Sequence, residues 1–177
     1  MQKGPVTSRS HLCTMSFSLP DLPNPLRENL SFYTIPLAWF IALSPRFYGA
    51  HKYSEETSGG DLDIRHPSGF SDEVAHDPQL KEETRNRIIR AEAAMDNGFE
   101  FIGLFAAAVC AGNIARLENR WLNGLSWGWL GSRVVYNLLY VNNETKALAK
   151  ARAGVFMAGM GMVFSLFVGA GNKLRQA

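Results

Sequence analysis

Two stretches of this chain place polar side chains within otherwise apolar helical sequence, and these side chains are its best candidates for chemistry. Within residues 81–113 they include Arg90, Asn97 and Glu100. Within residues 121–142 they are Arg133, Tyr136 and Tyr140. At about 100° of rotation per residue, the first three fall within about 80° of one helical face and the second three within about 60°. The spacing therefore predicts two polar stripes on neighbouring helices.

Together these stripes have the chemistry of a pocket for a polar, charged ligand at the edge of a bilayer. A carboxylate beside an amide suits an ammonium group, and the planar guanidinium of arginine suits a carboxylate. Tyrosine hydroxyls can donate hydrogen bonds to a thiol or a carbonyl. Spacing alone leaves two alternatives open: the tyrosines could be interfacial anchors, and Arg133 with Glu100 could be a structural ion pair between helices.

The charges of the chain stand in blocks, which predicts an integral membrane protein. Segments 29–45, 101–115 and 153–172, of 17, 15 and 20 residues, carry no charge, and 121–142 carries only Arg133. About 20 apolar residues are needed to cross the hydrocarbon core of a bilayer. A soluble helical bundle, the alternative, would show polar residues on its outer face at every turn. The predicted fold class is therefore all-α, an integral membrane four-helix bundle.

The predicted transmembrane domain covers residues 29–172, with helices at roughly 31–50, 81–113, 121–142 and 148–171. Pro36 and Pro45 are expected to kink the first helix or to end it early. The segment from Glu55 to Pro78 is rich in turn residues and is predicted to be an exposed loop. Residues 1–28 are polar and Pro-rich and are expected to be disordered, and Met15 offers a second translation start.

The distribution of basic residues gives a topology with a small margin. The loops after the first and third predicted helices hold nine Lys and Arg, and the opposite side holds seven. Arg85, Arg87 and Arg90 cluster near a membrane end, where positive charge has most effect on orientation. The two loops are therefore expected in the cytosol, with both termini across the membrane.

Small residues recur at helical spacing on two of the predicted helices. One series is Gly103, Ala107, Ala111 and Ala115, and the other is Gly161, Ser165 and Gly169. Such series let helix backbones approach closely. They fit packing within one chain and contact between copies equally well.

Several functional classes are disfavoured. A formal net charge of +2 argues against a protein that binds nucleic acid through a strong basic field. Two cysteines rule out a disulfide framework and a Cys-rich zinc module. The four histidines show no metal-ligand spacing, so no metal site is expected.

Three segments resemble, in order, the MAPEG family of membrane-associated proteins in eicosanoid and glutathione metabolism. Residues 91–109 resemble its second helix, in which an Asn is followed three residues later by a Glu and then by an apolar run; here these are Asn97 and Glu100. Ser132-Arg-Val-Val-Tyr136-Asn-Leu-Leu-Tyr140 resembles the Arg-x-x-Tyr-x-x-x-Tyr of its third helix. Residues 31–45 are similar to the first helix of the family's fungal microsomal glutathione transferase-like branch.

The resemblance implies a homotrimer in the endoplasmic reticulum membrane, with glutathione bound between subunits near the cytosolic face. A lipophilic small-molecule substrate would enter from the lipid bilayer. By position, Asn97 and Glu100 would hold the polar end of glutathione, and Tyr136 and Tyr140 would line its site, supported by Arg133. The family's thiol-activating arginine stands at the start of the fourth helix. Arg152 is the best candidate for it, with Lys146 and Lys150 as alternatives.

The chain also departs from the family pattern. Eicosanoid-making members carry an Arg seven residues before the Glu, where this chain has Ala93, and a Gln or His two residues later, where it has Met95. Arg90 lies one turn earlier and could compensate. The expected function is a glutathione-dependent transferase or isomerase acting on a lipophilic electrophile, in a setting such as secondary metabolism. The alternatives are a non-catalytic lipid-presenting scaffold and a membrane enzyme of this fold that does not use glutathione.

Overall fold

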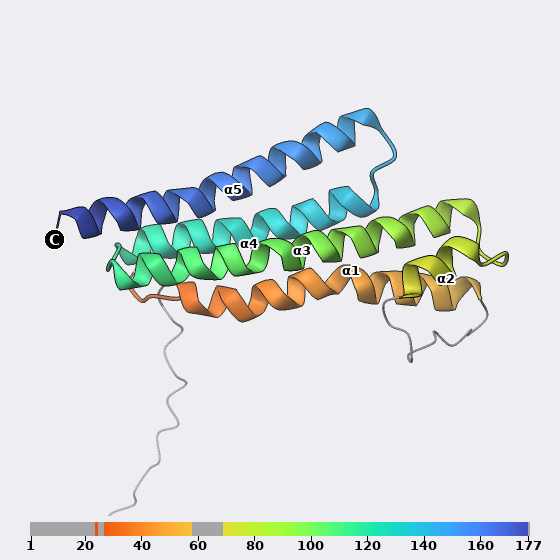
Figure 1. Cartoon of the computed structure of the whole chain (residues 1–177), viewed down its shortest axis with the longest axis horizontal. Helices are drawn as coiled ribbons and strands as arrows, with labels where there is room; N and C mark the ends of the chain where they lie inside the picture. The colour runs from red at the N-terminus through yellow and green to blue at the C-terminus, as the bar shows by residue number, and fades with distance from the viewer. Residues whose placement is uncertain (1–23, 25–26, 58–68, 177) are drawn as a thin grey trace, which may run out of the picture.

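The computed structural model describes residues 24, 27–57 and 69–176, and within them the chain is entirely helical. Four long helices lie side by side: α1 (Thr34–Glu56), α3 (Glu82–Ile114), α4 (Asn119–Val141) and α5 (Lys146–Arg175) (Figure 1). A 3-10 turn, η1 (Ser31–Tyr33), precedes α1, and a short helix, α2 (Phe70–His76), lies between α1 and α3. The predicted all-α class is confirmed. Apart from Asn24, Arg27 and Glu28, the N-terminal segment 1–28 lies outside the described residues.

Helix α1 continues through Pro45 to Glu56, beyond the end near residue 50 expected from the sequence. Pro45 has no backbone N–H to donate to the carbonyl of Ile41, one turn earlier. Two side chains replace that donor: Ser44 Oγ lies 2.8 Å from the Ile41 oxygen and Asn137 Nδ2, from α4, lies 3.0 Å from it. Because the freed carbonyl is satisfied, the helix has no reason to end at the proline.

Helix α2 forms within the segment that the sequence predicts to be only a loop. Phe70 and Val74, four residues apart and so on one helical face, are 2% and 0% exposed. They pack with Tyr53, Leu80 and Ile88 into a small core of their own. The loop prediction failed here because turn residues dominate the local composition, whereas burial of two apolar side chains decided the structure.

The main core lies between α1, α3, α4 and α5. The Phe105 and Trp129 rings stack in parallel there, with centroids 3.8 Å apart. Glycine sets the closest approach between α1 and α3, because a Cβ added at Gly98 would lie 2.9 Å from the Cβ of Ala42. The α1–α3 spacing therefore depends on a residue without a side chain.

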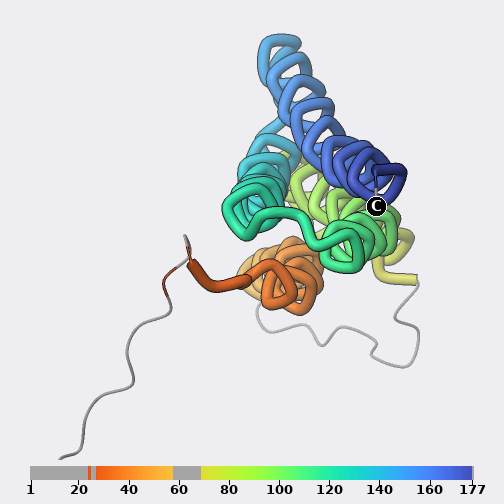
Figure 2. The backbone as a smooth tube through the Cα atoms, turned by 90° about the vertical axis from the view of Figure 1, so that its left-hand side faces the viewer, coloured from red at the N-terminus to blue at the C-terminus, as the bar shows by residue number. Residues whose placement is uncertain are grey.

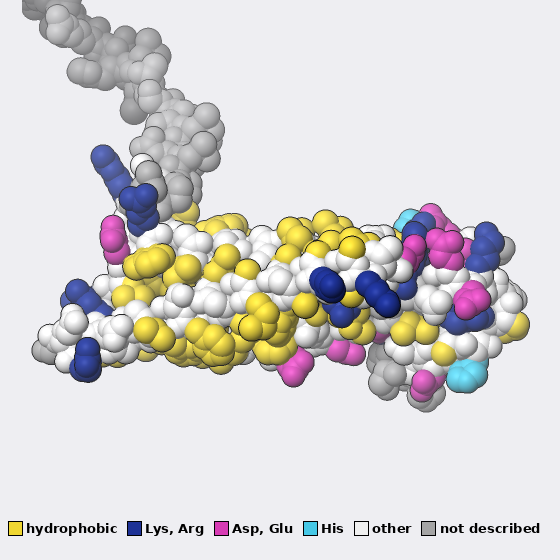
Figure 3. All heavy atoms as spheres, turned by 90° about the horizontal axis from the view of Figure 1, so that it is seen from above, with side chains coloured by type: hydrophobic (Ala, Val, Ile, Leu, Met, Phe, Trp, Pro, Cys, Tyr) yellow, Lys and Arg dark blue, Asp and Glu magenta, His cyan; other side chains and the backbone are white. Residues whose placement is uncertain are grey.

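On the face seen in Figure 3, apolar side chains cover much of the length of the bundle, and charged side chains gather at its two ends and in a smaller group between them. Large apolar side chains point outward from three different helices, among them Phe47 (65% exposed), Leu138 (62%) and Val168 (62%). Two helices, α3 and α5, are long and apolar enough to cross a membrane by length and composition. This is the surface of a helical membrane protein, in which lipid takes the place of water around the bundle.

One end of the bundle gathers the segments that carry most of the charged residues. The end of α1, helix α2, the start of α3 and the link from α4 to α5 all lie there (Figure 1). Helix α5 is inclined to the other long helices and diverges from α4 toward this end (Figures 1 and 2). We call it the α2 end.

Candidate functional site

Two arginines and three aromatic rings from α4 and α5 come together near the α2 end. Helix α4 supplies Arg133, Tyr136 and Tyr140, and α5 supplies Arg152 and Phe156. The Tyr136 ring lies between the other two rings, with its centroid 5.5 Å from that of Tyr140 and 6.0 Å from that of Phe156. We call these five residues the α4–α5 site.

Arg133 is the most deeply buried charged residue of this site. It is 3% exposed, and its Cζ atom lies 5.2, 5.1 and 5.3 Å from the ring centroids of Trp129, Tyr136 and Phe156. These rings stabilise the cation through their π faces. Among the described residues, however, none of its three guanidinium nitrogens has a hydrogen-bond partner. Buried charges are normally paired, so this guanidinium has the properties expected of a group that meets an anionic or hydrogen-bonding ligand.

The backbone of α5 passes close to this guanidinium at a glycine. A Cβ added at Gly159 would lie 2.7 Å from Arg133 Nη2 and 2.8 Å from Ser132 Oγ. Any side chain at this position would therefore displace the arginine. Because Gly159 has no side chain, the Arg133 guanidinium fits between α4 and α5.

Arg152 contacts the same site from its outer side. Its Cζ atom lies 4.2 Å from the centroid of the Tyr140 ring, a cation–π contact. Lys146 and Lys150, the alternatives considered from the sequence, are both exposed. Of these three basic residues, Arg152 is the one with a described ring contact in the α4–α5 site.

Glu100 lies on α3 and forms no ion pair with Arg133 within the described chain. The Glu100 side chain is exposed on the outer face of α3. A structural ion pair within one chain, the alternative considered from the sequence, is therefore not formed here.

Asn97 lies one turn before Glu100 on α3 and is half-buried. Its side-chain oxygen, Oδ1, is buried and has no hydrogen-bond partner among the described residues. The amide thus keeps an unused acceptor, the property required of a group that receives an N–H from a ligand.

Arg90 is directed elsewhere. Its Nε donates to the backbone oxygen of Val141 at 2.9 Å, and its Nη2 lies 3.7 Å from a carboxylate oxygen of Glu144. These contacts cap the C-terminal end of α4. The sequence predicts Arg90 on the same face as Asn97 and Glu100, whereas the structure uses its guanidinium to hold α3 against the end of α4.

Sequence reasoning missed two aromatic residues of this region, Trp129 and Phe156. Each lies four residues from an arginine of the site, Trp129 before Arg133 and Phe156 after Arg152. That spacing puts a ring on the same helical face as the cation and could have indicated both.

The part of the chain that the structure describes holds no group of three His, Cys, Asp or Glu side chains placed to bind a metal ion. His51 and His76 lie within it, whereas His11 and His66 lie outside. The model of the MAPEG family matches the chain over residues 32–172, a range that includes the α4–α5 site, Asn97 and Glu100. No curated protein and no solved structure matches the chain.

Proposed function

Since the chain belongs to the MAPEG family of helical membrane proteins, we propose that it is a membrane-bound, glutathione-dependent transferase or isomerase that acts on a lipophilic electrophile. Family membership supports a glutathione-related activity of this kind. The observation that carries the proposal is the buried Arg133 guanidinium, which has no hydrogen-bond partner in the described chain and lies beside Tyr136.

The residues present suit glutathione, a peptide with two carboxylates, one ammonium and one thiol. Arg133 offers unused donors for a carboxylate, and Asn97 offers an unused acceptor. Glu100 offers a carboxylate for the ammonium group. When bound, glutathione supplies the nucleophilic sulfur of the reaction.

Arg152 has the position to activate that sulfur. A thiol with a pKa of about 8.5 loses its proton more readily beside a cation. Arg152 stacks on Tyr140, so its positive charge is held at the border of the site and not in bulk solvent. In this proposal Arg152 stabilises the thiolate, while Tyr136 and Tyr140 line the space in which it reacts.

A homotrimer with its site between subunits is part of the proposal, and the outer face of α3 supports it. Glu100 is exposed there, one turn after the exposed Asp96, and a carboxylate without a cationic partner is costly within a membrane. One turn further, a Cβ added at Gly103 would meet no atom within 4 Å, so this small residue packs against nothing in its own chain. Crosslinking in mild detergent should trap three subunits. A chain that stays monomeric under several such conditions would remove the inter-subunit site.

We further propose an endoplasmic reticulum location with the α2 end in the cytosol. The basic residues Arg85, Arg87 and Arg90 near that end support this orientation. Protease added to sealed microsomes should cut the segment 51–86, part of which lies outside the described residues. Full protection of this segment together with cleavage near the N-terminus would reverse the orientation.

Calorimetric titration of glutathione into the detergent-purified protein tests the proposal most directly. We expect saturable binding, and conjugation of a chlorodinitrobenzene probe that depends on the protein. A second candidate, a non-catalytic lipid-presenting scaffold, is favoured by Ala93 and Met95, which replace two polar residues of eicosanoid-making members. No glutathione binding and no conjugation, with the protein folded, would favour that candidate.

A further inference from the structure

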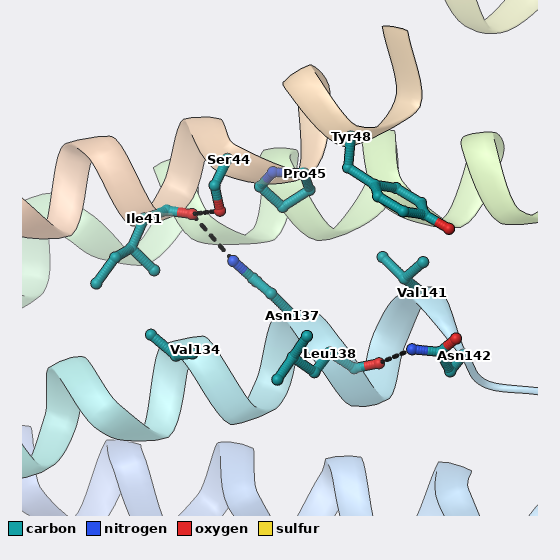
Figure 4. A pocket seen from close by; sticks show the side chains of 9 residues that line it. All are labelled: Ile41, Ser44, Pro45, Tyr48, Val134, Asn137, Leu138, Val141 and Asn142. Carbon is teal, nitrogen blue, oxygen red and sulfur yellow. Dashed lines mark hydrogen bonds between the residues drawn. The ribbon is translucent and has the colours of Figure 1, made fainter. Parts of the chain in front are cut away.

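A groove of about 310 Å³ runs between α1 and α4 near the α2 end. Its inner part is lined by apolar side chains, Ile41 from α1 and Val134 and Leu138 from α4 (Figure 4). Toward the α2 end it is lined by Tyr48 and Asn142, which carry polar groups (Figure 4). The lining is mostly apolar, and the polar groups of Ser44 and Asn137 also lie in its inner part.

The groove is built into the fold by Pro45. The Ile41 carbonyl that the proline leaves free accepts hydrogen bonds from Ser44 Oγ and Asn137 Nδ2 (Figure 4). Asn137 thereby ties α4 to α1, while Ser44 is a short side chain turned back onto its own helix. Because neither side chain fills the space beside Pro45, the chain leaves the groove open.

The polar end of the groove adjoins a set of charged residues of both signs, which we call the collar. Arg87 Nη2 lies 2.9 Å from a carboxylate oxygen of Glu83 and 3.2 Å from one of Glu144. Arg90, which donates to the backbone of the groove residue Val141, lies 3.7 Å from the same Glu144 oxygen. Two guanidinium groups thus face two carboxylates, and the four formal charges sum to zero.

The collar reaches the groove through Val141. Arg90 donates to the carbonyl of Val141, and both Val141 and Tyr48 line the groove at this end. A ligand in the groove would therefore meet apolar side chains along its tail, and donors and acceptors of both charges at its head.

We propose that this groove is a binding site for a zwitterionic phospholipid, with one acyl chain between α1 and α4 and the head group at the collar. A head group with a phosphate and an ammonium complements a collar that has both guanidinium and carboxylate groups. An anionic head group would gain the first contact and meet repulsion from Glu83 and Glu144. The groove opens on another side of α4 than the α4–α5 site, because Val134, Leu138 and Val141 lie on a face about 130° from Arg133, Tyr136 and Tyr140. Ile41 and Asn137 of the groove also border a small cavity beside Arg133 and Tyr136, so the two regions adjoin there. Lipid binding in the groove does not depend on glutathione binding.

Photolabelling of the full-length protein in nanodiscs tests this site. The probes are a phosphatidylethanolamine and a phosphatidylglycerol that carry the same diazirine-bearing acyl chain, and labelled residues are located by mass spectrometry. We expect phosphatidylethanolamine to label Ile41, Val134 and Leu138 about tenfold more than an exposed apolar residue outside the groove such as Met157, a ratio that corresponds to about 1.4 kcal/mol of preference. Phosphatidylglycerol should label the groove less.

Two variants fill the groove, Ser44→Phe and Val134→Phe, and Met157→Phe adds bulk at an exposed position of α5. Either groove variant should reduce groove labelling about tenfold, and Met157→Phe should leave it unchanged. A thermal melt of each variant shows which of them is folded, and one folded groove variant is sufficient.

Three outcomes would overturn the proposal. Equal labelling of all exposed apolar faces would mean that lipid only surrounds the bundle. Equal or stronger groove labelling by phosphatidylglycerol would exclude the zwitterionic ligand. Crosslinks from the groove to a second copy of the chain in place of lipid would assign it to an interface between subunits.

Discussion

Two regions toward the same end of the bundle differ in whether their arginine side chains have hydrogen-bond partners within the chain. At the α2 end, Arg85 donates to the backbone oxygens of Val74, Asp77 and Leu80, at 3.3, 2.7 and 3.2 Å. In the α4–α5 site, Arg133 is buried and has no hydrogen-bond partner in the described chain. Arg85 is half-buried and uses its donors within the chain, whereas Arg133 is buried and does not.

We interpret this difference as one between residues that stabilise the fold and residues that we propose bind a ligand. A buried polar group without a partner costs free energy that a paired group does not. A fold keeps such a group at a functional site, where a ligand supplies the missing partner. Substitutions at the α2 end should therefore reduce stability, and substitutions in the α4–α5 site should reduce binding or turnover.

The largest expected effect concerns the ion pair that joins α1 to α3 next to α2. Arg46 Nη1 lies 2.6 Å from Glu92 Oε2, and the Glu92 side chain is only 8% exposed. Arg46→Ala would leave a buried carboxylate unpaired, so we expect a loss of about 3–5 kcal/mol in the free energy of unfolding. Thermal melts in detergent measure it.

The matched control for this pair is the double variant Arg46→Met with Glu92→Leu. Apolar replacement of both partners leaves no buried charge, so most of the stability should return. A single Arg46→Ala variant as stable as the unsubstituted protein would contradict the structural role of the pair.

Arg133→Met should show the opposite pattern. It removes a buried cation that has no hydrogen-bond partner in the described chain, so the melting temperature should stay the same or rise. Glutathione affinity should fall by about 1.5–3 kcal/mol, the value of a hydrogen bond to a charged group. Calorimetry and thermal melts on one preparation measure both. A large loss of stability would make Arg133 a structural residue like Arg46.

Glu100→Gln keeps the shape of the side chain and removes its charge. Since the described chain holds no Glu100–Arg133 ion pair, the folded protein should survive, while glutathione binding weakens about tenfold or more. Stabilisation of the protein by added glutathione should shrink accordingly. If the substitution instead unfolds the protein and leaves that stabilisation intact, Glu100 is removed from the glutathione site.

Arg152→Ala should affect turnover and leave glutathione affinity nearly unchanged, because the proposed role of Arg152 is to stabilise the thiolate. We expect turnover at pH 7 to fall about tenfold, and the rate to rise with pH toward the ordinary thiol pKa of about 8.5. Lys150→Ala, at an exposed position on the same helix, is the matched control. Unchanged turnover and an unchanged pH profile in Arg152→Ala would exclude this role.

The smallest effect concerns Tyr53, at the α2 end beyond the membrane-spanning part of α1. Its hydroxyl donates to Asp77 Oδ2 at 2.9 Å, and burial together with this contact raises the pKa of Tyr53 to about 12. The folded protein therefore keeps this proton where the unfolded chain loses it. This contribution to stability is complete below pH of about 10 and is lost as pH rises toward 12.

Tyr53→Phe tests that contribution. The variant should lose about 0.5–1.5 kcal/mol at neutral pH. It should also show a smaller decrease in stability between about pH 10 and 12. Chemical unfolding at a series of pH values measures both effects. Identical pH profiles for the two proteins would show that folding does not raise the pKa of Tyr53.

Much of the fold could be predicted because it depends on local composition. The positions of α1, α3, α4 and α5 could be predicted from segments with few or no charges, because a helix that contacts lipid cannot carry exposed charges at every turn. The end of α1 could not be predicted in this way, because one of the two donors to the Ile41 carbonyl, Asn137, comes from another helix. Helix α2 was missed for a similar reason: its two buried side chains pack against residues of α1 and α3.

The sequence by itself determined which side chains share a face. Helical periodicity places Arg133, Tyr136 and Tyr140 on one side of α4, and no packing is needed to know it. Only the tertiary structure decided what that face meets. Packing brought Arg152 onto Tyr140, directed Arg90 to the end of α4, and let α5 approach Arg133 at Gly159. The physical reason is that rotation per residue is a property of one helix, whereas the partner of a buried charge depends on how neighbouring helices pack.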